Sequence, residues 1–475
     1  MLSSFYRPPL LTRREMLHRG GAGFGMLGLA GALQSAGVLS AAAAGESGIP
    51  PRTHFAPRAK RVIFLFMNGA PSHVDTFDPK PALAKYAGEK PPEDGRKRNK
   101  GGGLMPSPFG FAPHGESGVV MSELFPNLAH HADDLCVIRS MHTDVPNHEP
   151  GLLLMSSGHQ QPTRPSLGSW VSYGLGTENA NLPTFVALCP GLPVVGPQLW
   201  SSAFLPGEHQ GTSVDTNDLR VDSLVRNLHH PRLSREEQRR QLDLLAQLNE
   251  LHLASREHDA ALEAQIRAME LAFQMQREAA DAFDVSRESE HVRERYGRTV
   301  FGQTCLLARR LAEYGVRFIQ VYYVDKNEKQ PWDTHASNDD RHRKLCADSD
   351  RATAALLGDL KARGMLEDTL VVWGGEFGRT PYAQPNKDPK QVGRDHHHTG
   401  FSMFMAGGGV RGGTMHGATD EFGMNAVEGR VHIHDLHATI LHLLGIDHER
   451  LTYRYSGRDF RLTDVHGSVV RDVLA

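Results

Sequence analysis

The chain alternates short, continuously apolar runs with segments in which apolar residues recur every three or four positions. The first apolar run, VIFLFM, stops at the turn sequence NGAPS. Short runs of this kind, bounded by turns, are typical of strands buried on both faces of a parallel sheet. We predict strands at Val62–Met67, Leu135–Met141, Thr184–Leu188, Phe318–Val324, Thr369–Gly374 and Phe401–Ala406.

Helical periodicity fills several of the intervals between these runs. SELFPNLAHHA precedes the second run, CLLARRLAEYG the fourth and DSDRATAALLGDLKARGM the fifth. Strands that alternate with helices predict an α/β fold. We therefore expect a mostly parallel central sheet, covered by helices on both faces, in one domain over residues 61–475.

A helical insertion is predicted over about 234–295. Leu262, Ile266, Met269 and Phe273 recur at helical spacing among many Glu, Gln and Arg residues, which indicates one or two long amphipathic helices. These helices either pack on their own domain or form a heptad seam with a partner. The Gly- and Pro-rich stretch 88–118 is predicted to be a long loop.

The first 44 residues have the pattern of a targeting signal. Arg13 and Arg14 precede an uncharged Gly/Ala/Leu stretch that ends in small residues up to Ala44. This pattern predicts a twin-arginine signal peptide, with a membrane anchor as the alternative, followed by a linker over 45–60. We expect the twin-arginine export machinery as a partner and a periplasmic or secreted mature chain without a membrane span, because no later window is apolar for about 18 residues.

Charge and cysteine content exclude several classes of protein. With 52 basic and 55 acidic residues the net charge is −3, which gives no electrostatic reason to expect a nucleic acid partner. The four cysteines contain no C-x-x-C pair, so we expect mostly buried thiols rather than a zinc knuckle or a dense disulfide framework.

Histidines and carboxylates gather next to the predicted strand ends, where parallel sheets bind ligands. NGAPSHVDTFDPKP, MHTDVPNHEPG, QPWDTHASN and GGEFGRTP follow four of the apolar runs, and GRDHHHTG precedes the last. Imidazole and carboxylate groups from several strand ends are the ligands that a Zn²⁺ or similar site requires. In D-x-H, alternate residues of an extended segment point the same way, so Asp333 and His335 can reach one ion.

These motifs, together with HIHDLHATILHLLGID near the C-terminus, resemble the alkaline phosphatase and sulfatase superfamily. More closely, they resemble the bacterial family called domain of unknown function 1501, over nearly the whole mature chain. The resemblance implies hydrolysis of phosphate or sulfate esters with one or two metal ions. It also implies a Ser, Thr or modified Cys nucleophile, activated by charge that the ions supply.

The chain departs from the superfamily pattern at several positions. In strict register Asp144 replaces the nucleophilic Thr, with Thr143 one position away. Asn68 stands where a metal-binding Asp is usual, and Glu376 and Phe377 stand where an Asp-His pair is usual. Asp333 and His335 are closer together than the familiar ligand pair. A formylglycine sulfatase is disfavoured, because no C/S-x-P-x-R sequence is present.

The leading hypothesis is an exported metal-dependent hydrolase of phosphate or sulfate esters, acting on a small or glycan anionic ester. Thr143 is the expected nucleophile, although a water is an alternative. His142 and His148 bind metal, orient substrate or act as general acid, and Arg379 clamps an anionic oxygen. The ion is divalent, either zinc or calcium, and its expected ligands are Asp333, His335, Glu376, Asp395 and His396, with Asp75 and His73 as further candidates.

Two alternatives come from other classes of protein. A degenerate superfamily member binds an anionic glycan or an envelope partner without turnover, as the altered Asp-His pair suggests. A structural envelope component uses the helices of 234–295 for assembly.

Overall fold

The computed structural model describes residues 53–90, 102–225, 234–253, 278–386, 388 and 391–475. In this part of the chain a nine-stranded sheet has the order β12-β4-β11-β8-β1-β7-β5-β6, with β15 also paired to β4. All of these strands run in one direction except β11, which is antiparallel to both β4 and β8. The strands are β1 (Arg61–Met67), β4 (Leu135–His142), β5 (Phe185–Cys189), β6 (Thr212–Asp215), β7 (Phe318–Tyr323), β8 (Thr369–Gly374), β11 (Phe401–Ala406), β12 (Thr414–His416) and β15 (Val431–His432).

The six predicted strands all form, and the expected α/β fold with a mostly parallel sheet is confirmed. Thr369–Gly374 and Phe401–Ala406 have the predicted bounds, and the other strands differ by one or two residues. The sequence analysis missed β6, β12 and β15, which are short and carry polar residues. Their sequences lack the apolar run that marks a strand buried on both faces.

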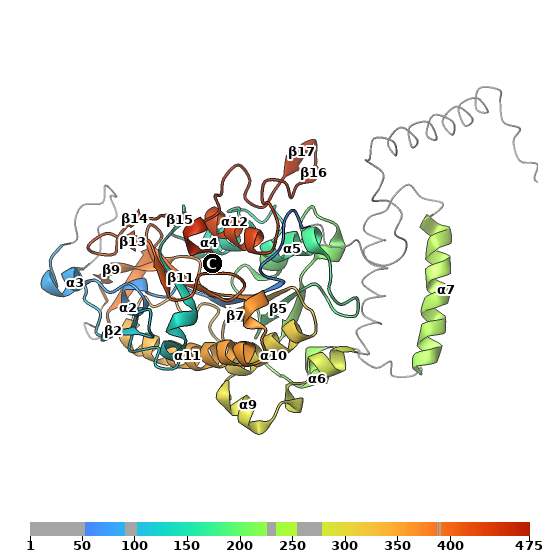
Figure 1. Cartoon of the computed structure of the whole chain (residues 1–475), viewed down its shortest axis with the longest axis horizontal. Coiled ribbons are helices and arrows are strands. Elements are labelled where there is room, and N and C mark those ends of the chain that lie inside the picture. Colours follow the sequence, from blue (N-terminus) through green and yellow to red (C-terminus); the bar gives the residue numbers. More distant parts are fainter. Residues whose placement is uncertain (1–52, 91–101, 226–233, 254–277, 387, 389–390) are drawn as a thin grey trace, which may run out of the picture. The chain divides into compact units, whose positions relative to one another are not determined.

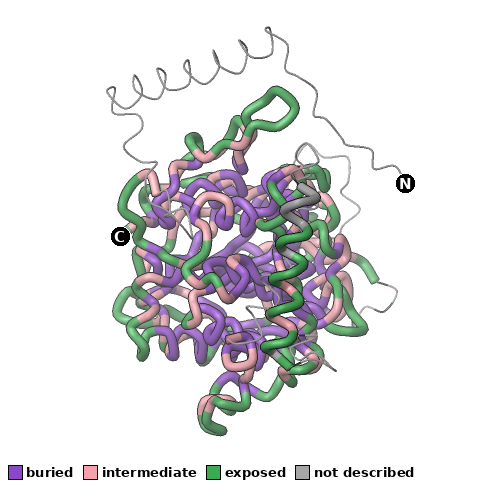
Figure 2. Tube along the Cα trace, turned by 90° about the vertical axis from the view of Figure 1, so that its right-hand side faces the viewer, coloured by how far each residue is buried: buried purple, intermediate pink, exposed green. Residues whose placement is uncertain are grey.

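The two faces of the sheet bury alternate residues of each strand. In β1, Val62, Phe64 and Phe66 contribute to one apolar cluster, and Ile63 and Leu65 contribute to the other, as the period of two requires. Figure 1 shows the corresponding helices on opposite sides of the sheet, and Figure 2 shows the buried positions concentrated in the interior. The first cluster includes α4 (His148–Ser157), α5 (Leu167–Leu175) and α12 (Ile433–Leu443), and the second includes α10 (Val300–Glu313) and α11 (Asn338–Ala362).

The helix predictions hold in part. CLLARRLAEYG lies in α10, and DSDRATAALLGDLKARGM lies mostly in α11. SELFPNLAHHA instead forms β-strand, turn and the 3₁₀ helix η1 (Leu128–Asp134), because Pro126 lacks the amide proton that an α-helix interior requires. The predicted loop over 88–118 contains β2 (Phe111–His114), which pairs with β3 (Val119–Ser122).

Several predictions fall wholly or partly outside the described residues. The signal peptide over 1–44 and residues 45–52 of the linker lie there, as does the apolar stripe from Leu262 to Phe273. Within 234–295 the structure describes α7 (Arg235–Leu253), helical residues at 278–282 and α9 (Glu290–Arg295).

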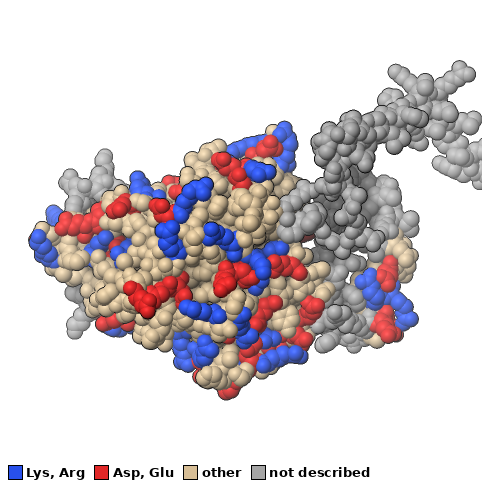
Figure 3. Space-filling view, viewed as in Figure 1, with Lys and Arg blue, Asp and Glu red and all other residues tan. Residues whose placement is uncertain are grey.

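The remaining short elements lie in the connections between the main ones. They are α2 (His73–Thr76), α3 (Pro81–Lys85), α6 (Val221–Leu224), β9 (Gly378–Gln384), β10 (Gly393–His397), β13 (Ala418–Thr419), β14 (Ala426–Glu428), β16 (Tyr453–Tyr455), β17 (Arg458–Phe460) and the 3₁₀ turns at 196–200, 207–209, 285–287, 366–368 and 471–473. Among the helices described, none has a run of apolar residues sufficient to cross a lipid bilayer. Acidic and basic side chains alternate over the face drawn in Figure 3.

The direction of the strands brings the predicted functional segments to one edge of the sheet. β1, β4, β7 and β8 are mutually parallel, so the loops that follow them share this edge. β11 runs the other way, so its amino end lies there and brings the preceding histidines with it. The β9–β10 hairpin connects β8 to β11 at the same edge.

A buried ion pair anchors this hairpin. The guanidinium of Arg394 in β10 donates to both oxygens of Asp75 in α2, at 2.7 and 3.1 Å, and neither side chain is exposed. Asp75 also accepts hydrogen bonds from Ser72 and Asn338. Burial acts to raise the pKa of Asp75, but the charge of Arg394 and the hydrogen bonds outweigh it and hold the pKa far below its usual range.

Replacing Arg394 with Met is expected to lower the free energy of unfolding by about 3–5 kcal/mol, because the substitution leaves a buried carboxylate without its partner. The matched control is Arg454→Met, which removes an exposed ion pair with Asp459 and is expected to change stability by about 0–1 kcal/mol. Chemical denaturation measures both. Equal stability of the two variants would contradict the anchoring role.

Candidate functional site

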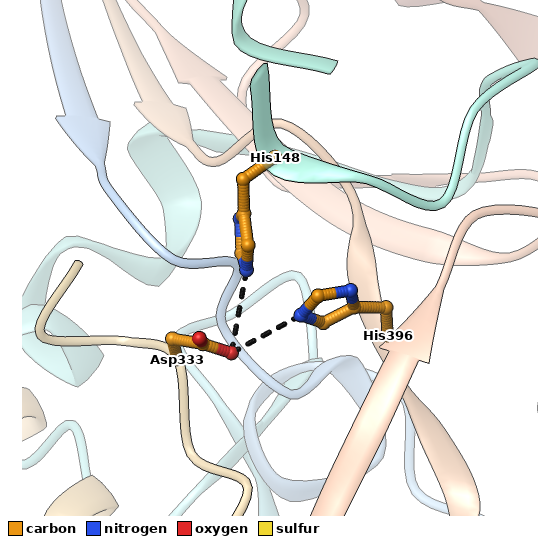
Figure 4. A group of neighbouring side chains, drawn as sticks. All are labelled: His148, Asp333 and His396. Carbon is orange, nitrogen blue, oxygen red and sulfur yellow. Dashed lines mark hydrogen bonds and ion pairs between the residues drawn. The ribbon is translucent and has the colours of Figure 1, made fainter. Parts of the chain in front are cut away.

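Three histidines surround the carboxylate of Asp333, which lies in the loop between β7 and α11. Asp333 Oδ1 is 3.3 Å from His148 Nε2 and 3.2 Å from His396 Nε2, as Figure 4 shows. His335 places its Nε2 3.0 Å from the same oxygen. Of the residues named from the sequence, the structure thus brings Asp333, His335, His396 and His148 together.

Asp333 is also paired with a buried guanidinium. Arg379 Nη2 lies 2.5 Å from Asp333 Oδ1. Burial acts to raise the pKa of Asp333, but its contacts with the three histidines and the charge of Arg379 outweigh burial and lower the pKa. Asp333 thus places a negative charge at the centre of the group.

His148 begins α4 and makes contact with carboxylates through both ring nitrogens. Its Nδ1 lies 2.6 Å from Glu376 Oε1, and its Nε2 faces Asp333. Burial acts to lower the pKa of His148, but the hydrogen bonds to Asp333 and Glu376 outweigh it and raise the pKa to about 9. Because a carboxylate only accepts hydrogen bonds, Nδ1 carries a proton in either state of the ring.

His396 is oriented by the backbone of the loop between β4 and α4. Its Nδ1 lies 2.8 Å from the carbonyl oxygen of Pro146, which only accepts, so Nδ1 carries the proton. Burial lowers the pKa of His396, which favours the neutral ring. In that ring Nε2 has no proton, and its lone pair points at a carboxylate oxygen 3.2 Å away.

A second group of donor atoms shares His396. It consists of His335, Asp395 and His396, and it is more open to solvent than the first group. The Nε2 atoms of His335 and His396 are 3.0 Å apart, and His335 Nδ1 is 2.5 Å from Gln384 Oε1 and 3.8 Å from Asp395 Oδ1. The hydrogen bond to Asp333 is the main cause that raises the pKa of His335.

Arg379 is fully enclosed by protein. Besides Asp333, its guanidinium donates to the carbonyl oxygens of Gly69, Ala70 and Arg394. Each of these groups is an acceptor that would otherwise lie unpaired in a buried region. In this position Arg379 orients Asp333 and the turn after β1, and a bidentate clamp on a substrate oxygen would require these bonds to break.

Glu376 is also fully buried, and the structure directs its carboxylate at His148 and at the backbone. The amide of Gly69 donates to Oε1 and Oε2 at 3.1 and 3.4 Å. A glycine is required there because φ is +107° and a Cβ atom would lie 2.4 Å from the backbone nitrogen of Asp333. Glu376 belongs to neither group of converging donor atoms in the described residues.

The other predicted site residues lie outside both groups. His73 and Asp75 are in α2, where His73 Nε2 bonds to the carbonyl of Gly423 and Asp75 pairs with Arg394. The ring of His142 lies 5.0 Å from that of His432, and burial, with the charge of His432, lowers the pKa of His142 to about 4.

Thr143 follows β4 in the loop that leads to His148. Its amide donates to the carbonyl of His398 at 2.8 Å. Its hydroxyl is buried and has no hydrogen-bond partner in the part of the chain that the structure describes, which is uncommon for a buried polar atom.

The sequence analysis named Asn68 as a departure from the superfamily pattern but gave it no role in the site. Asn68 is completely buried at the end of β1, and neither of its side-chain polar atoms has a hydrogen-bond partner among the described residues. Gln384 and the carbonyl of Pro146 orient His335 and His396. The position of Asn68 in NGAPS, directly after the first apolar run, pointed to the site. The contact of Pro146 could not be predicted, because every residue type has a backbone carbonyl oxygen.

Solved structures similar to this chain include a sulfatase, a periplasmic domain and an alkaline phosphatase, all at low identity. The sulfatase PsFucS1 from Pseudoalteromonas sp. is 14% identical, with 88% of this chain and 72% of that chain covered and a TM-score of 0.37. The periplasmic domain of EptC from Escherichia coli, in complex with Zn, is 9% identical, with 84% and 87% covered and a TM-score of 0.36. Alkaline phosphatase from the Antarctic bacterium TAB5 is 12% identical, with 81% and 98% covered and a TM-score of 0.35.

No curated protein sequence matches the chain. A family model does match, over residues 59–474, and its description is "Protein of unknown function (DUF1501)". This range includes every residue of the Asp333 site described above. The chain therefore belongs to the DUF1501 family.

Proposed function

We propose that this protein is an exported hydrolase of phosphate or sulfate esters that depends on a divalent metal ion. The observation that carries the proposal is the meeting of His148, His396 and Asp333. When the two rings are neutral, both present unprotonated Nε2 atoms to one carboxylate oxygen, because their Nδ1 protons are bonded to Glu376 and Pro146. In the metal-free protein the raised pKa of His148 keeps a proton on its Nε2, which faces Asp333. A divalent ion would replace that proton and hold both Nε2 atoms and the carboxylate oxygen together.

The distances and the donor types fit a small metal ion. In a tetrahedral zinc site with bonds of about 2.0–2.2 Å, two ligand atoms lie roughly 3.3 Å apart. His148 Nε2 and His396 Nε2 are 3.3 and 3.2 Å from Asp333 Oδ1. Imidazole nitrogens favour zinc over calcium, which takes oxygen ligands. We therefore propose zinc rather than calcium.

His148, Asp333 and His396 would hold the ion, and His335 would add a further nitrogen from the more open side. When bound, such an ion supplies positive charge that stabilises the oxygens of an ester undergoing displacement. The Thr143 hydroxyl, which has no hydrogen-bond partner among the described residues, is the proposed nucleophile.

The export part of the proposal is supported by the N-terminal sequence, in which Arg13 and Arg14 precede an uncharged stretch. The twin-arginine machinery is the partner that this sequence predicts. Export in the folded state suits a protein that acquires its metal before it leaves the cytoplasm.

A second candidate function is supported by Phe377. Its ring centre lies 4.9 Å from that of His148 and 5.0 Å from that of His396, so an apolar group occupies the space beside the proposed ion. Together with the neutral Asn68, Phe377 leaves fewer ligands for a second ion. The alternative function is therefore binding of an anionic glycan at this site without turnover.

Replacing Asp333 with Asn is expected to reduce zinc affinity by more than about 100-fold. Loss of a residue that only hydrogen-bonds to a ligand reduces metal affinity by roughly 10–100-fold, whereas Asp333 contributes the central charge of the site. Competition with a chromogenic chelator measures affinity, and elemental analysis measures bound metal. Asp459→Asn, an exposed position on β17, is the control and is expected to bind like the wild type. The proposal fails if the wild-type protein holds no divalent ion.

Replacing Thr143 with Ala is expected to reduce hydrolysis of aryl phosphate or aryl sulfate by about 10³-fold or more if its hydroxyl is the nucleophile. Thr143→Ser retains a hydroxyl and is expected to keep much of the activity. Zinc content should be unchanged in both variants. Full activity in Thr143→Ala would assign the attack to water, and an absence of turnover in the wild type with every ester would favour the binding-only alternative.

A further inference from the structure

We propose that Glu376 is a positioning residue that fixes the ring of His148 for metal binding, and that its carboxylate is not itself a ligand. This inference rests on the proposed metal site and changes the role that the sequence suggested for Glu376. The contact that carries it is the 2.6 Å hydrogen bond between His148 Nδ1 and Glu376 Oε1. This bond directs the opposite nitrogen, Nε2, at Asp333.

The carboxylate of Glu376 is directed at His148 and at the backbone of Gly69. Oε1 accepts from His148 and from the amide of Gly69, and Oε2 faces the same amide at 3.4 Å. The side chain is completely buried. Among the described residues, Glu376 belongs to neither group of converging donor atoms, and its shortest side-chain contact is the hydrogen bond to His148.

The packing around His148 favours one orientation of the ring. The ring of Phe377 lies 4.9 Å from that of His148. One turn along α4, Gly151 allows the helix to approach the Glu376 segment, because a Cβ atom at this glycine would lie 3.2 Å from the Phe377 ring and 3.6 Å from the Cβ of Glu376. The helix and the segment after β8 are therefore in close contact where the hydrogen bond forms.

A carboxylate in this position contributes in two ways. It selects the ring form with a proton on Nδ1 and a lone pair on Nε2, and its negative charge makes that lone pair a better donor. His396 obtains the first effect from the carbonyl of Pro146, which is neutral. The two imidazoles of the site are thus oriented by different acceptors, and only His148 has one that is charged.

The test compares Glu376→Gln, Glu376→Ala and the exposed control Glu428→Ala in the full chain. Glu376→Ala is expected to weaken zinc binding by about 10–100-fold. Glu376→Gln retains an acceptor oxygen for His148, so its loss should be smaller. X-ray absorption of the zinc-loaded Gln variant should show the same number of nitrogen and oxygen ligands as the wild type, whereas loss of an oxygen ligand would overturn the proposal.

A double-mutant comparison and a metal-free measurement complete the test. Because Glu376 acts through His148, adding Glu376→Ala to His148→Ala should cause no further loss of affinity. In the metal-free protein, the Nδ1 proton of His148 should give a low-field nuclear magnetic resonance signal, assigned with His148→Gln and absent from Glu376→Ala. If the wild type lacks this signal, the positioning role is overturned. If the signal is present but the protein binds no zinc, the hydrogen bond between His148 and Glu376 stands and only the metal site is rejected.

Discussion

One buried guanidinium connects the segments on which the site depends. Arg379, in β9, donates to the carbonyl oxygens of Gly69 and Ala70 after β1, to the carbonyl of Arg394 in β10 and to the carboxylate of Asp333 after β7. The acceptors come from parts of the chain that are distant in sequence. A planar group with five donors suits this task better than a lysine ammonium.

The charges around Arg379 compensate one another. Arg379 is buried and pairs with the partly buried Asp333, and Asp75 and Arg394 form a fully buried pair near the loop end of the same hairpin. A buried charge is costly unless it is paired and hydrogen-bonded. The second pair holds β10 against α2, and β10 carries His396. The position of an imidazole in the site is therefore determined partly by a salt bridge that never contacts it.

The sequence predicted the sheet well because buried parallel strands have a strong apolar signal, as in VIFLFM and TLVVWG. It also predicted the neighbourhood of Asp333, His335 and His396, because strand ends of a parallel sheet meet at one edge. It did not predict which atoms each side chain would contact. Arg379 was expected to face a substrate and Asp75 to face an ion, yet each is enclosed by internal partners. Residue type indicates charge, but burial and pairing depend on tertiary packing.

The hydrogen bond between His396 and the carbonyl of Pro146 links two elements that the chain separates by 250 residues. Pro146 lies between Thr143 and His148, in the loop from β4 to α4. A displacement of this loop would turn the His396 ring, and a rotation of the ring would pull on the loop. The loop from β4 to α4 and the β9–β10 hairpin are thus coupled mechanically. Slow amide hydrogen exchange in the loop and a fixed orientation of the His396 ring in the hairpin would then report the same local opening equilibrium.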